Sequence, residues 1–347
     1  MGLKRKLFVF SFSFSSIGGP LALVGQFLKN VSTLEVILSL IIFAPITYMT
    51  YYAMDKVWDK GGLYDYVSKF TPNLSRYFLF FWIFSYFLYL SYTVDYIVYW
   101  ILNENGLMAS ILVLLITLAI ATIVYIGREL EFLLVSTILQ IVFALPFNWN
   151  FRPFSPFEFN LNVVLSTSLL YICITLTPFV GNGSKEGINS IFLAYLISGT
   201  ILLLDSFFNI PKIIYLISSF STFSLIIVEF YSLRNVLSRT TLKNINLYLI
   251  LAFIISTLIS LVNPYVYYIY TITPSVTALY VSLILFFISV TLSIENKLKV
   301  LSILSLGLLA YGLYTSLQFS SFYLLIEQIL TIIIISLIPF VKNLLSY

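Results

Sequence analysis

The first apolar segment of the chain is interrupted by Ser15-Ser16-Ile17-Gly18-Gly19-Pro20, where a membrane helix would ordinarily continue with Leu or Ile. Glycine and proline both disfavour a continuous helix, so we expect an unwound segment here. The N–H groups of Gly18 and Gly19 then lie at the positive end of the following half-helix, where they can bind a carboxylate. The carbonyls near Ser16 and Ile17 face an ammonium or another cation. These two poles predict a binding site for a small zwitterion.

A second interruption of the same kind runs from Thr175 to Gly183 and contains a proline and two glycines. Its candidate substrate-binding residues are Thr177, Phe179, Gly181 and Asn182. Lipid cannot satisfy the backbone groups that a broken helix frees, so such breaks persist only where protein or a water-filled cavity surrounds them. The alternative interpretation is that glycine and proline mark only a kink or a close contact between helices.

Acidic side chains deep in apolar segments are further candidates, because a charge in hydrocarbon is costly and is retained for a function. Asp95 is a candidate site for a coupling ion, and Tyr92, three residues earlier, is a candidate substrate contact. At helical spacing they share one stripe with three more tyrosines, Tyr89, Tyr96 and Tyr99. The stripe either lines the outer approach to the site or forms an interfacial aromatic belt in which Asp95 reaches the lipid headgroups.

Glu229 is the second acidic candidate for ion coupling. It precedes Arg234 by five residues, so a side chain that snorkels to the aqueous surface is the competing interpretation. Glu327, in the last apolar segment, is interpreted as structural.

The composition requires a membrane environment for these elements. Sixty per cent of the residues are apolar and 9% are charged, so the chain has too little polar surface to cover a globule in water. The mean hydropathy of +1.03 agrees. One cysteine, Cys173, and no histidine exclude a disulfide framework and an ordinary His/Cys metal site. The net charge of +4 is scattered over short loops, which gives no indication of a nucleic acid partner.

Segments of about 20 apolar residues predict an all-α integral membrane protein with about twelve transmembrane helices. With the N-terminus inside, 15 of the 18 Lys and Arg residues fall on the inner side, which supports a multi-pass protein of the cytoplasmic membrane with both termini in the cytoplasm. The predicted spans are residues 7–28, 34–54, 74–102, 107–126, 130–147, 163–184, 187–209, 212–236, 245–262, 265–293, 297–316 and 320–342.

The two interruptions fall in spans one and six, which are corresponding members of two five-span repeats. Because five is odd, the second repeat is inverted in the membrane, and matched breaks in inverted repeats indicate a transporter's central site. We therefore expect one transmembrane domain, 1–347, with a first repeat at 1–148, an inverted repeat at 149–293 and two additional helices at 294–347.

Four segments resemble the amino acid permeases of the amino acid–polyamine–organocation (APC) superfamily. Gly61-Gly62-Leu63-Tyr64-Asp65-Tyr66-Val67 resembles their inner Gly-Gly-x-Tyr-x-Tyr-Val segment, and Ile17-Gly18-Gly19-Pro20-Leu21 resembles their first-helix Ile-Gly-Ser-Gly-Ile pattern. Pro153–Phe157 resembles their external loop, and Arg234–Arg239 resembles their basic cytoplasmic end. The resemblance implies the 5+5 leucine-transporter-type fold with discontinuous helices 1 and 6.

The chain also departs from that family. Pro20 stands where the family usually has a second glycine and removes one N–H donor from the expected carboxylate site. The inner half-helix and acidic loop that follow span six in the family are shortened here to Asn182–Glu186. Sodium-coupled members of the fold class place hydroxyls of span eight against carbonyls of span one, which makes Ser221 and Thr222 candidates for ion coupling.

From these patterns we expect a secondary active transporter, and not an enzyme, that moves an amino acid or a related small amine by alternating access. We expect no cofactor other than a coupling H⁺ or Na⁺, and the expected partners are the substrate and the lipid bilayer. Two alternatives remain open. A major-facilitator-type transporter is one, because Asp55–Gly62 resembles that group's Asp-Arg-x-Gly-Arg-Arg loop. A membrane-embedded enzyme is the other, and it would need polar residues clustered near one face.

Overall fold

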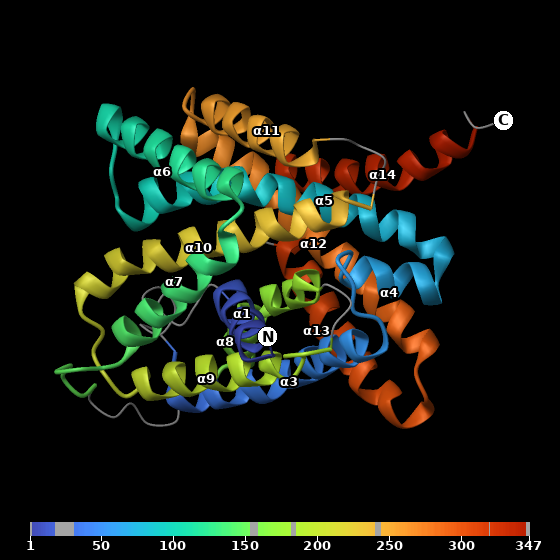
Figure 1. The fold of residues 1–347 in the computed structure, drawn as a ribbon, viewed down its shortest axis with the longest axis horizontal. Helices are drawn as coiled ribbons and strands as arrows, with labels where there is room; N and C mark the ends of the chain where they lie inside the picture. The colour runs from blue at the N-terminus through green and yellow to red at the C-terminus, as the bar shows by residue number, and fades with distance from the viewer. Residues whose placement is uncertain are drawn as a thin grey trace.

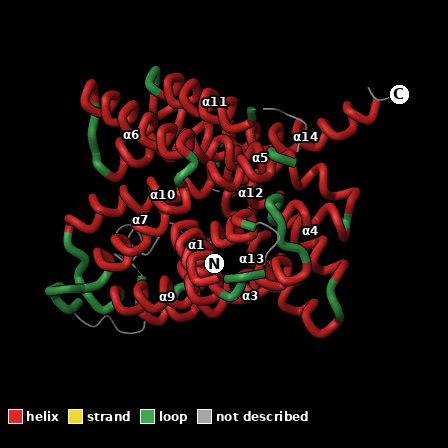
Figure 2. The backbone as a smooth tube through the Cα atoms, in the orientation of Figure 1, coloured by secondary structure: helices red, strands yellow, loops and turns green. Residues whose placement is uncertain are grey.

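The computed structural model describes residues 2–17, 31–152, 159–181, 185–239, 244–318 and 320–344, which form a bundle of helices joined by short loops (Figures 1 and 2). Within these residues the only β-type pairing is an isolated antiparallel bridge between Phe151 and Phe208. The elements in chain order are α1 (Gly2–Ser16), α3 (Thr33–Lys56), α4 (Leu63–Phe70), α5 (Pro72–Asp95), the π-helix η2 (Tyr96–Ile101), α6 (Gly106–Ile126), α7 (Glu129–Ala144), α8 (Leu161–Leu169), the 3₁₀-helix η3 (Ile172–Val180), α9 (Ser190–Asp205), α10 (Lys212–Leu237), α11 (Ile245–Ser260), α12 (Pro264–Ser293), α13 (Asn296–Gln318) and α14 (Phe322–Leu344).

Eight helical segments of the described chain are long and apolar enough to cross a bilayer. They are α3, α5 with η2, α6, α8 with η3, α10, α12, α13 and α14. Two further apolar helices, α9 and α11, have only 16 residues each. Each predicted span contains at least part of a helix, whereas the count of twelve crossings stays a prediction.

The start of α3 shows how local sequence also fixes tertiary position. The Ser32 side chain accepts a hydrogen bond from the Glu35 N–H at 3.2 Å, and the Glu35 carboxylate accepts one from the Ser32 N–H at 2.8 Å. This capping box satisfies two N–H groups that a helix terminus leaves free. The second Glu35 oxygen accepts from the Asn160 N–H at 2.9 Å. The cap therefore ties the start of α3 to the start of α8.

α1 occupies the middle of the molecule (Figure 1). It packs against α7, α9, α10 and η3, and its residues from Ser11 to Ser16 are all buried. The longest helix, α12, packs along α5 and on its other sides against α13 and α14. In this central position α1 packs against the 3₁₀-helix of residues 172–180.

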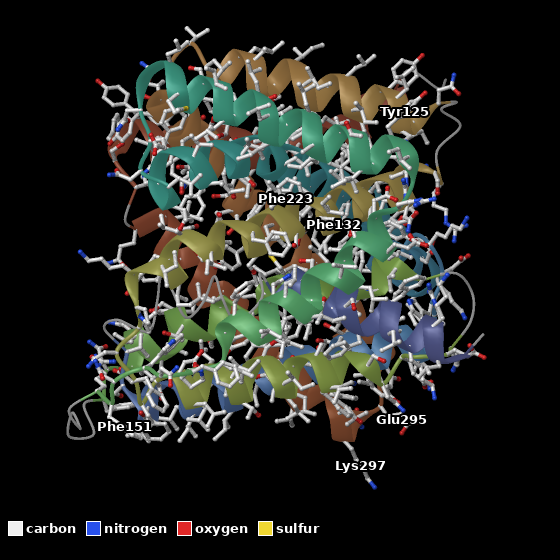
Figure 3. All side chains as sticks on the ribbon, turned by 60° about the vertical axis from the view of Figure 1, so that its left-hand side comes forward. Tyr125, Phe132, Phe151, Phe223, Glu295 and Lys297 are labelled. Carbon is white, nitrogen blue, oxygen red and sulfur yellow. The ribbon has the colours of Figure 1, made fainter. Side chains whose placement is uncertain are left out.

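The loops separate onto two opposite faces of the bundle. Figure 3 places Tyr125, at the end of α6, and Phe151, in the loop before α8, on opposite sides. On the side of Tyr125, which we call the basic face, the Lys and Arg residues of several loops pair with acids: Lys185 with Asp55, Arg234 with Glu129, and Arg239 with both Asp59 and Asp65. On the opposite face Arg152 donates to the Val31 carbonyl at 3.2 Å. The inner loops expected from the charge pattern thus lie together.

Gly62, the residue that precedes α4, supplies a test of this packing. It has a φ of +57°, and a Cβ atom added there would lie 2.5 Å from the Phe179 ring. Gly106 has a φ of +65°, but a Cβ atom added there would have no neighbouring atom within 4 Å. An L side chain costs roughly 1–2 kcal/mol in such a backbone conformation at either site. We predict that Gly62→Ala lowers the midpoint of thermal unfolding in detergent more than Gly106→Ala does, and an equal loss in the two variants would contradict the contact with Phe179.

Candidate functional site

The chain after α8 is not a continuous α-helix. α8 ends at Leu169, and the backbone continues as η3, a 3₁₀-helix of nine residues that are all buried. Runs of 3₁₀-helix longer than three or four residues are uncommon. Three β-branched residues, Ile174, Thr175 and Thr177, precede Pro178, so residues of low α-helix propensity are concentrated here. A segment without α-helical hydrogen bonding is therefore present at the second predicted break, as far as it is described.

α1 ends at Ser16, where the first break is predicted. The Ser16 hydroxyl donates to the Ser13 carbonyl at 2.7 Å, and both Ser16 and Ile17 are buried. The predicted carboxylate-binding residues Gly18 and Gly19 lie outside the described residues, as does Asn182. α1, the helix that precedes the first predicted break, packs against η3, the segment of the second predicted break.

The end of η3 is held by three side chains from three different elements. The Trp58 indole N–H donates to the Pro178 carbonyl at 3.0 Å, and the Asn235 amide donates to the Phe179 carbonyl at 2.7 Å. Arg5 of α1 donates to the Val180 carbonyl at 2.6 Å. Its guanidinium also lies 5.6 Å from the Trp58 ring, within cation–π range. Trp58, Asn235 and Arg5, together with these three carbonyls, form what we call the inner closure.

Side-chain packing completes the inner closure. The Phe179 ring stacks on Trp82 with centroids 4.3 Å apart, and it fills the space that Gly62 leaves open. Gly181 lies so near Trp58 that an added Cβ would come within 2.6 Å of the indole ring. Phe179 and Gly181 are thus packed against protein in this conformation. Their predicted contact with substrate stays a prediction.

Ion pairs surround the inner closure at the basic face. Arg239, at the end of α10, binds Asp59 and, at 2.9 Å, Asp65. Burial by itself raises the pKa of Asp59, but hydrogen bonds from Arg239 and from the Lys60 N–H outweigh it, so the pKa lies below its usual value. The Asp59 carboxylate is therefore ionised at neutral pH and available to Arg239. Lys185 and Asp55 pair at 2.8 Å on an exposed surface, where such a pair contributes little.

Glu229 lies in the middle of α10 and is fully buried. Neither of its carboxylate oxygens has a hydrogen-bond partner. Arg234, five residues later on the same helix, pairs with Glu129 of α7. The snorkelling interpretation of Glu229 is wrong, because no part of the side chain reaches the surface. Four groups lie close enough to interact with its charge, the phenols of Tyr86, Tyr89 and Tyr92 and the thiol of Cys173.

Asp95, the last residue of α5, is also fully buried. Its Oδ1 accepts a hydrogen bond from the Ser260 hydroxyl of α11 at 3.0 Å, whereas its Oδ2 has no partner. The alternative that Asp95 reaches lipid headgroups is therefore wrong. The helix continues beyond it as η2, and π-helical turns occur frequently at functional sites. Tyr92, one turn earlier, is buried with its ring edge-on to Tyr268 at 5.6 Å.

The candidate hydroxyls of α10 bond to other protein groups. Ser221 donates to Gln140 of α7 at 2.9 Å, and the Gln140 amide donates to Ser136 at 2.8 Å. Ser136 and Ser224 then lie 2.5 Å apart. Thr222 donates to a carbonyl of its own helix at 3.2 Å. A role of Ser221 and Thr222 in binding Na⁺ stays a prediction.

Several residues of the site were not found by reasoning from the sequence. Cys173 and Tyr86 sit beside Glu229, but a lone cysteine and one of many tyrosines carry no signal of their own. Asp205, at the end of α9, is fully buried with both carboxylate oxygens unpaired. The rule for acidic residues inside membrane segments would have identified Asp205. The hydroxyl of Thr177, a predicted substrate contact, is likewise buried without a partner.

A cavity of about 480 Å³ lies between α8, α12 and α13. Asn162 and Gly312 line it, and so does Tyr280, which also interacts electrostatically with Cys173. Among the described residues no group of three or more His, Cys, Asp or Glu side chains is placed to hold a metal ion.

The arrangement is that of a multi-pass, all-helical membrane protein with an interrupted helix at its centre. Its fold is shared with a transporter. A manganese transporter from Eremococcus coleocola, solved with an aromatic bis-isothiourea substituted compound, superimposes with a TM-score of 0.58 at 11% identity, covering 96% of this chain and 92% of that chain. Two mutant structures of a manganese transporter from the same organism superimpose with TM-scores of 0.56 at the same identity and coverage. No family model and no curated protein matches the sequence.

Asn235 allows the inner closure to be tested. Asn235→Leu keeps the side-chain volume but removes the donor to the Phe179 carbonyl, at a net cost of about 1 kcal/mol. We predict that Cys173, the only cysteine, then reacts about fivefold faster with a water-soluble thiol reagent, because the closed population falls. Asn246→Leu is the matched control, since Asn246 donates to the Val124 carbonyl at 3.3 Å away from η3. Equal labelling rates in both variants would show that the Asn235 bond does not hold the closure.

Proposed function

We propose that this protein is a secondary active transporter that moves amino acids or related small amines across a membrane by alternating access. The proposal includes the five-plus-five inverted-repeat organisation of the APC-type permeases, with repeats at 1–148 and 149–293 and two additional helices at 294–347. It also includes twelve crossings, cytoplasmic termini and H⁺ or Na⁺ as the coupling ion. It does not include an enzymatic reaction.

The observation that carries the proposal is the 3₁₀ segment η3, which is buried and packs against α1. A membrane protein keeps irregular backbone at this depth only where protein or a cavity surrounds it. Interrupted helices that meet near the bilayer midplane are the usual ligand sites of inverted-repeat transporters. In the proposed repeats α1 is the first helix of the first repeat, and α8 with η3 is the first helix of the second. The two predicted breaks therefore occupy corresponding positions in the two repeats.

Alternating access also requires a closure that can be released. Hydrogen bonds to three carbonyls and partly exposed ion pairs form the closure at the basic face. Each hydrogen bond contributes only about 1 kcal/mol and each exposed ion pair less than that. The sum is small enough for a ligand's binding energy to shift the equilibrium between closed and open states.

A divalent metal is the second candidate substrate, because the superimposed structures are manganese transporters. Glu229 and Cys173 are the buried groups of the described centre that could ligate a metal. One carboxylate and one thiol fall short of the four to eight ligands that protein metal sites ordinarily provide. The amine substrate is therefore preferred.

A ligand screen tests the proposed substrate class. We predict that at least one α-amino acid raises the unfolding temperature of the purified protein and undergoes counterflow in proteoliposomes, because both ends of a zwitterion find partners at a helix break. Hexoses are the control and should have no effect. Stabilisation by Mn²⁺ alone, or by hexoses alone, would contradict the proposal.

Asp95 tests the proposed coupling. We predict that Asp95→Asn abolishes uptake driven by a pH gradient but preserves counterflow, because counterflow needs the substrate site but no net proton movement. Glu104→Gln, which changes an exposed acid in the loop after η2, is the control. Gradient-driven uptake that persists in Asp95→Asn would assign the coupling ion to another site, such as the α10 hydroxyls.

A further inference from the structure

Glu229 shares with Asp205 a full burial in which neither carboxylate oxygen has a hydrogen-bond partner. Asp95, by comparison, accepts a hydrogen bond from Ser260. Moving an ionised carboxylate into an apolar interior without a partner costs many kcal/mol, so its charge has to be balanced by another group.

Aromatic rings surround the Glu229 carboxylate on the α5 side. Tyr86, Tyr89 and Tyr92 follow one another at three-residue intervals, and all three phenols interact with its charge. The ring centroids of Tyr86 and Tyr89 lie 6.3 Å apart, and those of Tyr89 and Tyr92 lie 4.9 Å apart. The three rings therefore form a continuous aromatic wall.

No described basic residue balances this charge. The groups that interact with the Glu229 charge are the three phenols of α5 and the Cys173 thiol of η3, and all four are neutral at pH 7. The buried ends of the neighbouring helices offer no free charge, because Arg5 of α1 is bound to Val180 and Glu129 of α7 is bound to Arg234. The balancing positive charge must therefore come from a proton or from a ligand.

We propose that Glu229 and the wall of Tyr86, Tyr89 and Tyr92 bind the positively charged head of an organic amine. The inference rests on the proposed transport function and selects, within its substrate class, ligands with a net positive charge. A carboxylate supplies the countercharge of the ammonium, and the electron-rich faces of tyrosine rings attract a cation within about 6 Å of their centroids.

Charge balance predicts that the amine exchanges with a proton when it binds to the site. In the empty site a proton on Glu229 removes the charge, and on binding the ammonium takes the place of that proton. The step is Glu-COOH + R-NH₃⁺ → Glu-COO⁻···⁺H₃N-R + H⁺, and the proton leaves to water. The net charge of the site is zero before and after, so binding one amine releases one proton.

The experiment compares butylamine with butanol, a neutral molecule of similar size, on the purified full-length protein in nanodiscs. Thermal unfolding reports binding, and isothermal titration in two buffers of different ionisation enthalpy reports the protons released. We expect butylamine, but not butanol, to stabilise the protein, with one proton released per amine bound. Glu229→Gln should weaken butylamine binding at least about tenfold and remove the proton release.

Two further variants separate the site from general effects on folding. Glu327→Gln makes the same carboxylate-to-amide change in α14, outside the proposed site, and should bind butylamine as the wild type does. Tyr89→Leu removes the aromatic ring that the proposal places beside the ammonium, so butylamine binding should weaken. Unchanged butylamine affinity in Glu229→Gln, or equal stabilisation by butanol, would overturn the inference.

Leucine, measured alongside, distinguishes failure of this inference from failure of the proposed function. If leucine stabilises the wild type and undergoes counterflow while butylamine does not bind, the cation site is wrong and the transporter proposal stands. If neither leucine nor butylamine binds and only Mn²⁺ does, both are wrong.

Discussion

The backbone of an interrupted helix inside a bilayer needs hydrogen-bond partners that lipid cannot supply, and this constraint organises the centre of the molecule. η3 ends in the carbonyls of Pro178, Phe179 and Val180, and each accepts a bond from a side chain of a different element. Trp58, Asn235 and Arg5 must therefore converge on one place, which fixes the ends of α10 and α1 against the loop after α3. The same bonds hold the protein closed at its basic face.

The packing around this centre differs from the closure in strength. α5 and α12 bury large aromatic side chains along an extensive contact. The Glu35 carboxylate joins α3 to α8, because it caps α3 and also accepts a hydrogen bond from the Asn160 N–H. The inner closure consists of single hydrogen bonds and partly exposed ion pairs, which contribute individually little. A movement that opens the basic face can therefore break the closure and leave the longer helices intact. This division into firm and weak contacts is what alternating access requires.

The superposition on a manganese transporter at 11% identity shows how little of a membrane fold depends on residue identity. Apolar segments of suitable length, breaks at the right positions and small polar groups between helices are enough to preserve the arrangement. The ligand is decided by a few side chains at the centre, and the fold alone does not specify them. The described centre of this chain contains a carboxylate, a thiol and several phenols, and the sequence has no histidine.

The sequence by itself determined the membrane environment, the positions of the helices and the place of the second helix break, because hydrophobic runs and a proline among β-branched residues act locally. It also identified Asp95 and Glu229 as intramembrane acids. The sequence did not determine their surroundings: Arg234, five residues from Glu229, binds Glu129 of another helix, and Ser260 reaches Asp95 from 165 positions away. No local sequence pattern identified Trp58, Asn235 or Arg5, since each donates its hydrogen bond to a carbonyl more than 50 residues away in the chain. Only the tertiary structure decides which polar groups meet, because in the bilayer each polar group must find its partner on whichever helix packing brings within reach.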